Sequence, residues 1–239
     1  MGNEDYPVFE EQVPDEQVPF AEEEDAFDGA EFVDNPEPRC PVVLLLDTSK
    51  SMTGKPIEEL NAGLQLFHDE LLEDELAAKR VEVAVVAFGP VRVETEFSTP
   101  EFFSAPDLAA EGETPLGAAV DTALQLVEQR KETYRENGIN YYRPWVFLIT
   151  DGAPTDQWEQ AARDIQAGEK EGRFAFFPVG VQNANLDVLG KLSSRSPMHL
   201  DGLRFRDLFT WLSRSLQKVS QSQLGTEVAL PSPSGWTSV

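Results

Sequence analysis

An aspartate and two serines stand at alternate positions directly after an apolar run of strand length. The run, Pro41–Leu46, leads into Asp47, and Ser49 and Ser51 follow in the next turn. A buried strand that ends in such a turn presents carboxylate and hydroxyl oxygens together at one edge of a sheet. Hard divalent cations bind carboxylate, hydroxyl and water oxygens in a near-octahedral arrangement. The spacing therefore predicts part of a divalent-metal site in this turn.

A second apolar run delivers an aspartate in the same way, because Trp145–Thr150 is followed by Asp151. In open α/β sheets, ligands bind beyond the carboxyl ends of the strands. We therefore expect Asp47 and Asp151 to be neighbours. Two carboxylates would match the charge of a divalent cation, while neutral hydroxyls beside them would leave the ion electrophilic enough to take one more acidic ligand.

Apolar periodicity predicts the elements that must position these side chains. The expected strands are 41–47, 81–88, 91–96, 145–150, 174–181 and 198–200. The expected helical segments between and after them are 56–71, 116–136, 156–170, 187–192 and 205–219. Strands that alternate with helices predict an α/β fold with a doubly wound, mainly parallel central sheet and helices on both faces. The period-two pattern at 91–96 predicts one antiparallel edge strand, and Asp156 with Glu159 indicates a capping box for the helix that they begin.

Negative charge is concentrated at the N-terminus. Residues 1–38 carry 14 of the 43 acidic side chains and none of the 19 Lys and Arg residues. Such a segment cannot bury enough apolar surface to offset the entropy of ordering it. The expected organisation is a disordered acidic tail over 1–38, one domain over 39–222, and a loose Ser/Pro/Gly-rich tail over 223–239.

Composition also limits the partners and the compartment. A net charge of −24 argues against nucleic acid and against an anionic membrane surface as partners. No apolar run approaches the roughly 20 residues that a membrane-spanning helix needs. Cys40 is the only cysteine, so no internal disulfide can form, and the acidic N-terminus has no secretory-signal pattern. We therefore expect a cytoplasmic protein.

Three short motifs carry a resemblance to a known family. The Asp-x-Ser-x-Ser turn at 47–51, an isolated threonine before Pro-Leu, and Thr-Asp-Gly at 150–152 resemble the metal-ion-dependent adhesion site (MIDAS) of von Willebrand factor A (VWA) domains. The resemblance covers about 40–220 and implies a VWA-like fold. It also implies that the metal, Mg²⁺ by preference with Mn²⁺ or Ca²⁺ as alternatives, takes its last ligand from an Asp or Glu of a protein partner. The implied metal ligands, direct or through water, are Asp47, Ser49, Ser51, Thr114 and Asp151.

Two further stretches resemble a narrower branch of that family. Val-Asp-Asn-Pro-Glu-Pro-Arg at 33–39 and Asp-Gly-Ala-Pro-Thr-Asp at 151–156 look like those of the bacterial TerY-like branch. That branch is associated with tellurium-resistance and chemical-stress gene clusters, often beside a protein kinase and a phosphatase. The resemblance implies a cytoplasmic, non-catalytic adaptor whose partner would be a kinase or phosphatase from the same gene cluster.

Departures from the family pattern leave alternatives open. Glu113 stands where a glycine or small residue is common, so its carboxylate could repel an incoming acidic ligand or coordinate the ion itself. An Asp or Glu of the acidic tail (residues 1–38) could also occupy the open position on the metal. A regulatory scaffold that acts mainly through the acidic tail, or an Asp-based metal-dependent hydrolase, are the competing functions. No Ser/His/Asp set and no phosphate-binding Gly-rich loop is evident, so no catalytic residue is assigned.

Overall fold

The computed structural model describes residues 32–233 and 236–238. The chain divides into two units, Met1–Asp34 and Asn35–Val239, and only residues 32–34 of the first are described, as one helical turn. The fold below is that of the second unit. Most of the predicted acidic tail lies outside the described residues and stays a prediction. Within the described part of the chain, no helix combines the length and the apolar character that crossing a membrane requires.

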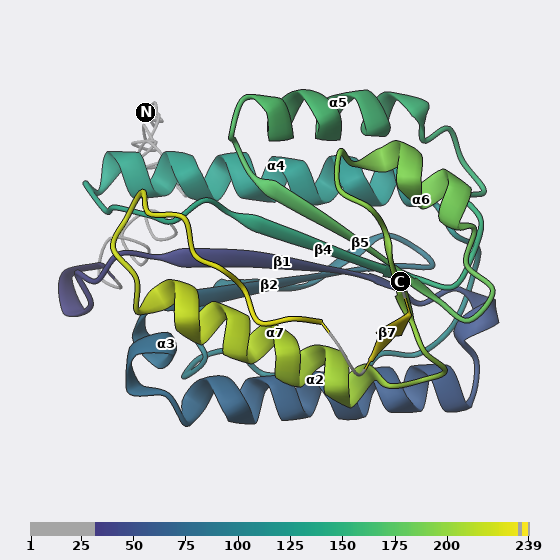
Figure 1. Ribbon diagram of the computed structural model, residues 1–239, viewed down its shortest axis with the longest axis horizontal. Coiled ribbons are helices and arrows are strands. Elements are labelled where there is room, and N and C mark those ends of the chain that lie inside the picture. The colour runs from purple at the N-terminus through teal and green to yellow at the C-terminus, as the bar shows by residue number, and fades with distance from the viewer. Residues whose placement is uncertain (1–31, 234–235, 239) are drawn as a thin grey trace, which may run out of the picture. The chain divides into compact units, whose positions relative to one another are not determined.

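A seven-stranded sheet forms the centre of the second unit, with the strand order β3-β2-β1-β4-β5-β6-β7 in the described residues (Figure 1). Neighbouring strands from β2 to β6 run parallel, whereas β3 pairs antiparallel with β2 at one edge and β7 antiparallel with β6 at the other. The strands are β1 (Cys40–Asp47), β2 (Val81–Phe88), β3 (Arg92–Ser98), β4 (Trp145–Thr150), β5 (Ala175–Val181), β6 (Met198–Leu200) and β7 (Thr237–Ser238). The predicted doubly wound, mainly parallel sheet with an antiparallel edge strand is confirmed, and β7 adds a second antiparallel edge.

Helices cover both faces of this sheet, with α4, α5 and α6 on one side and α2, α3 and α7 on the other (Figure 1). The helices are α2 (Lys55–Leu72), α3 (Glu75–Arg80), α4 (Leu116–Glu136), α5 (Glu159–Lys170), α6 (Leu186–Leu192) and α7 (Phe205–Ser220), and a 3-10 turn, η1, covers Lys50–Met52. The short helix α3 was not expected from the sequence.

The strand that leads to Asp47 is buried along its whole length. Val42 and Leu44 belong to the core under α2 and α7, while Val43 and Leu45 belong to the core under α4 and α5. A strand covered on both faces must be apolar at every position, which explains the continuous rather than alternating run in the sequence. The two cores hold β1 in place and so fix where its last residue points.

The segment after α7 returns to the sheet in part. Trp236 is buried, its ring centroid lies 5.5 Å from that of Trp211, and its carbonyl accepts a hydrogen bond from the backbone N–H of Asp201 at 2.9 Å. A loose tail was expected over 223–239 from its Ser, Pro and Gly content. The structure instead places the buried Trp236 and β7 within that segment. A single tryptophan changes the composition of such a segment very little, so composition did not indicate this packing.

A buried charged network joins the amino ends of β1 and β2. The Glu82 carboxylate lies 2.8 Å from Nε of Arg39 and 2.8 Å from Nε of Arg130, and the Tyr134 hydroxyl donates a hydrogen bond to it. All four side chains are buried. Burial, followed by the Glu82 charge, raises the pKa of Tyr134 well above its usual range. The sequence of the apolar run 81–88 gave no indication that Glu82 is the centre of a buried network.

We predict that Glu82→Ala is strongly destabilising. The substitution leaves two buried guanidinium groups without the carboxylate that both contact, and breaking a buried pair costs about 3–5 kcal/mol. Urea unfolding followed by circular dichroism would measure this loss. Glu94→Ala is the matched control because its partner Arg92 is 41% exposed, and an exposed pair contributes about 0–1 kcal/mol. Similar losses for both variants would contradict the role given to Glu82.

Candidate metal centre

The carboxyl ends of β1 and β4 lie next to each other in the sheet. These strands pair in parallel, with Leu46 opposite Ile149. Asp47 is the last residue of β1, and Asp151 directly follows β4. Parallel pairing in this register brings both aspartates to the same edge, as the sequence predicts.

Hydrogen bonds connect four of the five expected ligands in a continuous chain. Ser51 Oγ donates to Asp151 Oδ1 at 2.6 Å, and the Oγ atoms of Ser49 and Ser51 lie 2.9 Å apart. The backbone N–H of Ser49 donates to Asp47 Oδ1 at 2.8 Å. Asp47 and Ser49 are buried, whereas Ser51 is exposed. The chain therefore leads from the end of the core to the protein surface.

Thr114, the fifth expected ligand, reaches the same place from the start of α4. A Cβ atom added to Gly152 would lie 2.9 Å from Thr114 Oγ1 and 3.5 Å from Asp47 Oδ2. The threonine hydroxyl and the aspartate carboxylate thus border the same small space, which any side chain at residue 152 would enter. The carbonyl of Thr114 accepts a hydrogen bond from the backbone N–H of Thr155 at 2.9 Å, so the loop after β4 also holds the threonine.

Backbone contacts bring the loop before α4 against the turn after β1. The N–H of Glu111 donates to the carbonyl of Thr48 at 2.7 Å. Gly112 has φ +69°, and a Cβ there would lie 2.1 Å from the carbonyl oxygen of Gly89. Only glycine fits that approach and that dihedral angle without strain. The long connection after β3 therefore ends in a fixed position two residues before Thr114.

Asp156 caps α4 rather than its own helix, which corrects the capping box expected with Glu159. Its Oδ1 accepts from the N–H of Gly117 at 3.0 Å, and its Oδ2 accepts from the N–H of Ala118 at 2.9 Å. The N-cap of α5 is Trp158, which makes no side-chain capping bond. The free N–H groups at the start of α4 attract a carboxylate from another loop just as they would a local one. The loop after β4 is thereby fastened to α4.

Burial raises the pKa of Asp47, and the nearby charge of Asp151 acts in the same direction. Hydrogen bonds from Ser49 and from the Thr150 hydroxyl oppose this shift without cancelling it. Neither aspartate forms an ion pair with any residue that the structure describes. A bound cation would supply the missing opposite charge.

The chemistry of these side chains fits a hard divalent ion. Two carboxylates and three hydroxyls meet at one sheet edge, beside a glycine that leaves space for a ligand. The expected ligands Asp47, Ser49, Ser51, Thr114 and Asp151 offer only side-chain oxygen atoms, which hard cations prefer. Few carboxylates combined with neutral oxygens suit Mg²⁺ better than the larger Ca²⁺.

Three residues that shape this centre were not expected from the sequence to do so. Thr150 bonds Asp47, Gly152 keeps the space beside Thr114 open, and Asp156 fastens the loop to α4. Thr150 and Gly152 flank Asp151 within the motif that carried the resemblance, so a signal for them was present. The role of Asp156 depends on a contact between distant segments and had no local signal.

A sequence model of the von Willebrand factor type A domain matches residues 42–207, more than half of the chain. The chain belongs to this family. The narrower TerY-like branch stays a prediction. No curated protein sequence matches the chain.

Solved structures share the VWA fold with this chain at low sequence identity. The pilus adhesin SpaC from Lactobacillus rhamnosus GG, in its open conformation, has a TM-score of 0.61 and 11% identity over 76% of this chain and 30% of the adhesin. Proximal thread matrix protein 1 from the mussel byssus has a TM-score of 0.54 and 16% identity over 75% of this chain and 48% of its own. This VWA chain therefore spans less than half the length of either protein, and the likeness shows the fold alone.

We predict that Asp47→Asn separates the cost of the buried charge from its use in metal binding. The amide removes a charge that burial disfavours and keeps an oxygen that can accept from the Ser49 N–H. In a chelator near pH 7, the variant should melt at the same temperature as the wild type or higher. Millimolar Mg²⁺ should raise the melting temperature of the wild type only, because a ligand that binds only the native state stabilises it.

The difference in melting temperature between Asp47→Asn and the wild type in chelator should change with pH. Burial holds the pKa of Asp47 above its unfolded value of about 3.9. The stabilisation that comes from the protonated carboxyl is therefore complete below that value and is lost as pH rises through the raised pKa. The advantage of Asp47→Asn in chelator should vanish in acid and grow toward neutral pH. A wild-type melting curve that does not respond to Mg²⁺ would contradict the metal site.

Proposed function

We propose that this VWA chain is a non-catalytic protein-binding domain that takes an Asp or Glu side chain of a partner through a divalent metal. Mg²⁺ is the first choice of metal, with Mn²⁺ or Ca²⁺ as alternatives. The observation that carries the proposal is the hydrogen-bonded chain from Asp47 through Ser49 and Ser51 to Asp151, with Thr114 beside Gly152.

The bound ion would supply a positive charge that bridges the domain and an acidic group of the partner. Asp47 and Ser49 would hold it from the buried side, because both are fixed by the end of β1. Ser51 is exposed and Asp151 is half-buried, so this side of the centre faces solvent and can meet a partner. Two carboxylates balance a divalent charge, and the hydroxyls add none. Because these other ligands are neutral, the ion would stay electrophilic enough to take one more acidic ligand from outside.

The arrangement of Asp47 favours binding over catalysis. An aspartate nucleophile must present a carboxylate oxygen to its substrate. Asp47 is completely buried, and its two oxygens accept hydrogen bonds from Ser49 and Thr150. The two histidines of the chain do not complete a catalytic set, because the ring Nε2 atoms of His68 and His199 bond backbone carbonyls away from this site.

The finer proposal is a cytoplasmic adaptor of the TerY-like branch, in a stress-response or tellurium-resistance system, with a kinase or phosphatase as partner. It rests on the resemblance of 33–39 and 151–156 to that branch. The first stretch has a structural role here: Arg80 pairs with Glu37 at 2.6 Å, and Arg39 donates to the carbonyls of Asn35 and Glu37.

We predict that Ser49→Ala and Asp47→Asn each abolish partner capture in Mg²⁺ without unfolding the domain. Capture from a bacterial lysate, quantified by mass spectrometry with Mg²⁺ and with chelator, would measure this. Ser98→Ala on β3 is the matched serine control, since within the described part of the chain its hydroxyl makes one hydrogen bond, to the carbonyl of Glu96 at 3.4 Å. Capture that survives both changes and the chelator would instead support the competing scaffold, in which the acidic tail makes the main contact.

We predict that Glu113→Gln strengthens the binding of an acidic ligand by up to about fivefold, since an exposed charge interaction is worth roughly 0.2–1 kcal/mol. Glu113 is exposed and directly precedes Thr114. Titration of acetyl-glutamate amide into the Mg²⁺-loaded protein, followed by NMR, would measure the change. Glu132→Gln is a control on the exposed surface of α4. Weaker Mg²⁺ binding by Glu113→Gln would show instead that this carboxylate coordinates the ion.

A further inference from the structure

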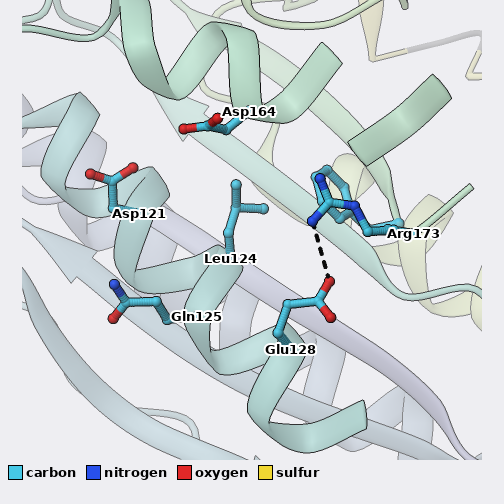
Figure 2. A pocket seen from close by; sticks show the side chains of 7 residues that line it. Asp121, Leu124, Gln125, Glu128, Asp164 and Arg173 are labelled. Carbon is cyan, nitrogen blue, oxygen red and sulfur yellow. Dashed lines mark ion pairs between the residues drawn. The ribbon is translucent and has the colours of Figure 1, made fainter. Parts of the chain in front are cut away.

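A groove between α4 and α5 lies outside the metal centre (Figure 2). Its volume is about 300 Å³, at the lower end of the range for ligand sites in proteins. A space of that size suits one or two side chains rather than a folded segment. The groove is lined by Asp121, Leu124 and Glu128 from α4, by Asp164 from α5, and by Arg173 and Phe174 from the turn before β5, among others.

The two ends of the groove differ in charge balance. At one end, Glu128 binds Lys131 at 3.0 Å and lies 3.8 Å from Arg173. At the other end, Asp121 and Asp164 project from two different helices, with Leu124 between the two ends (Figure 2). Neither Asp121 nor Asp164 forms an ion pair with a residue that the structure describes. One end is therefore neutralised and the other carries two uncompensated carboxylates.

The environment of Asp121 reinforces this imbalance. Partial burial raises its pKa, and the charges of Asp164 and Asp156 add to the shift. Asp164 accepts hydrogen bonds from the neutral Gln160 side chain at 3.0 and 3.1 Å, which leaves its charge in place. A cation at this end of the groove would relieve the repulsion between the carboxylates.

The floor of the groove is apolar. Leu124 is half-buried, Phe174 is buried, and both line the space beside the carboxylates. A long side chain with an aliphatic stem and a cationic head matches this combination, since such chains lay their methylenes on apolar surface and keep the charge at the edge. Arginine fits well, because its planar guanidinium offers several N–H donors to carboxylates.

We propose that this groove binds an arginine or lysine side chain of a protein partner, with the stem over Leu124 and Phe174 and the cationic group at Asp121 and Asp164. Asp121 is the sixth residue of α4 and follows Thr114 by seven positions, which at about 1.5 Å per helical residue is on the order of 10 Å. A partner that used both sites would present an acidic and a basic side chain about that far apart. The groove itself needs no metal, so it can be tested separately from the proposed function.

The test is an NMR titration of the full chain, in chelator, with acetyl-arginine amide and its neutral isostere acetyl-citrulline amide. Arginine should shift amide signals of α4, α5 and the turn at 173–174, and added salt should weaken the effect. The double variant Asp121→Asn with Asp164→Asn should bind about fivefold more weakly, because each exposed pair is worth roughly 0.2–1 kcal/mol. The control, Glu132→Gln with Glu136→Gln, makes the same charge change on exposed positions of α4.

Equal responses to arginine and citrulline would overturn the proposal, as would shifts spread over the whole acidic surface. Equal weakening in the two double variants would also overturn it, because only net charge would then matter. Binding that persists in the Asp47→Asn variant would support the groove, even if Mg²⁺ failed to bind the wild type. The outcome for the groove is thus independent of the outcome for the metal centre.

Discussion

Two neighbouring carboxylates without a cationic partner are the constraint on which the rest of this domain depends. Asp47 is buried, Asp151 lies close by, and neither pairs with a basic side chain of the described residues. Parallel pairing of β1 with β4 enforces the arrangement, because both strands end at the same edge of the sheet. An uncompensated buried carboxylate is unfavourable. A positive charge bound at this edge of the sheet would reduce that cost.

Four connecting segments hold this edge in place through contacts with one another. The turn after β1 bonds the loop before α4, Gly112 packs on Gly89, and Asp156 reaches from the loop after β4 to the start of α4. These contacts join segments that lie far apart in the sequence. None of them uses the carboxylate of Asp47 or Asp151.

The strands and most helices could be predicted because each has a strong local pattern. The run before Asp47 is apolar at every position, and α4 and α7 have clear helical faces. The expected metal ligands could be located because each stands at the end of such an element. Glu82, Asp156 and Trp236 were different, since each contacts a residue that lies more than 20 positions away in the sequence. A single sequence carries no local signal for contacts of that kind.

The cap on α4 gives the domain two hydrogen atoms that respond to the state of the loop after β4. The amides of Gly117 and Ala118 donate to Asp156 across the space between that loop and the helix. If the loop lifts, both protons lose their acceptor and exchange with solvent, since nothing within the first turn of a helix replaces it. Their exchange rates would thus report how long the loop stays closed. Neither amide belongs to the residues that are expected to bind the metal.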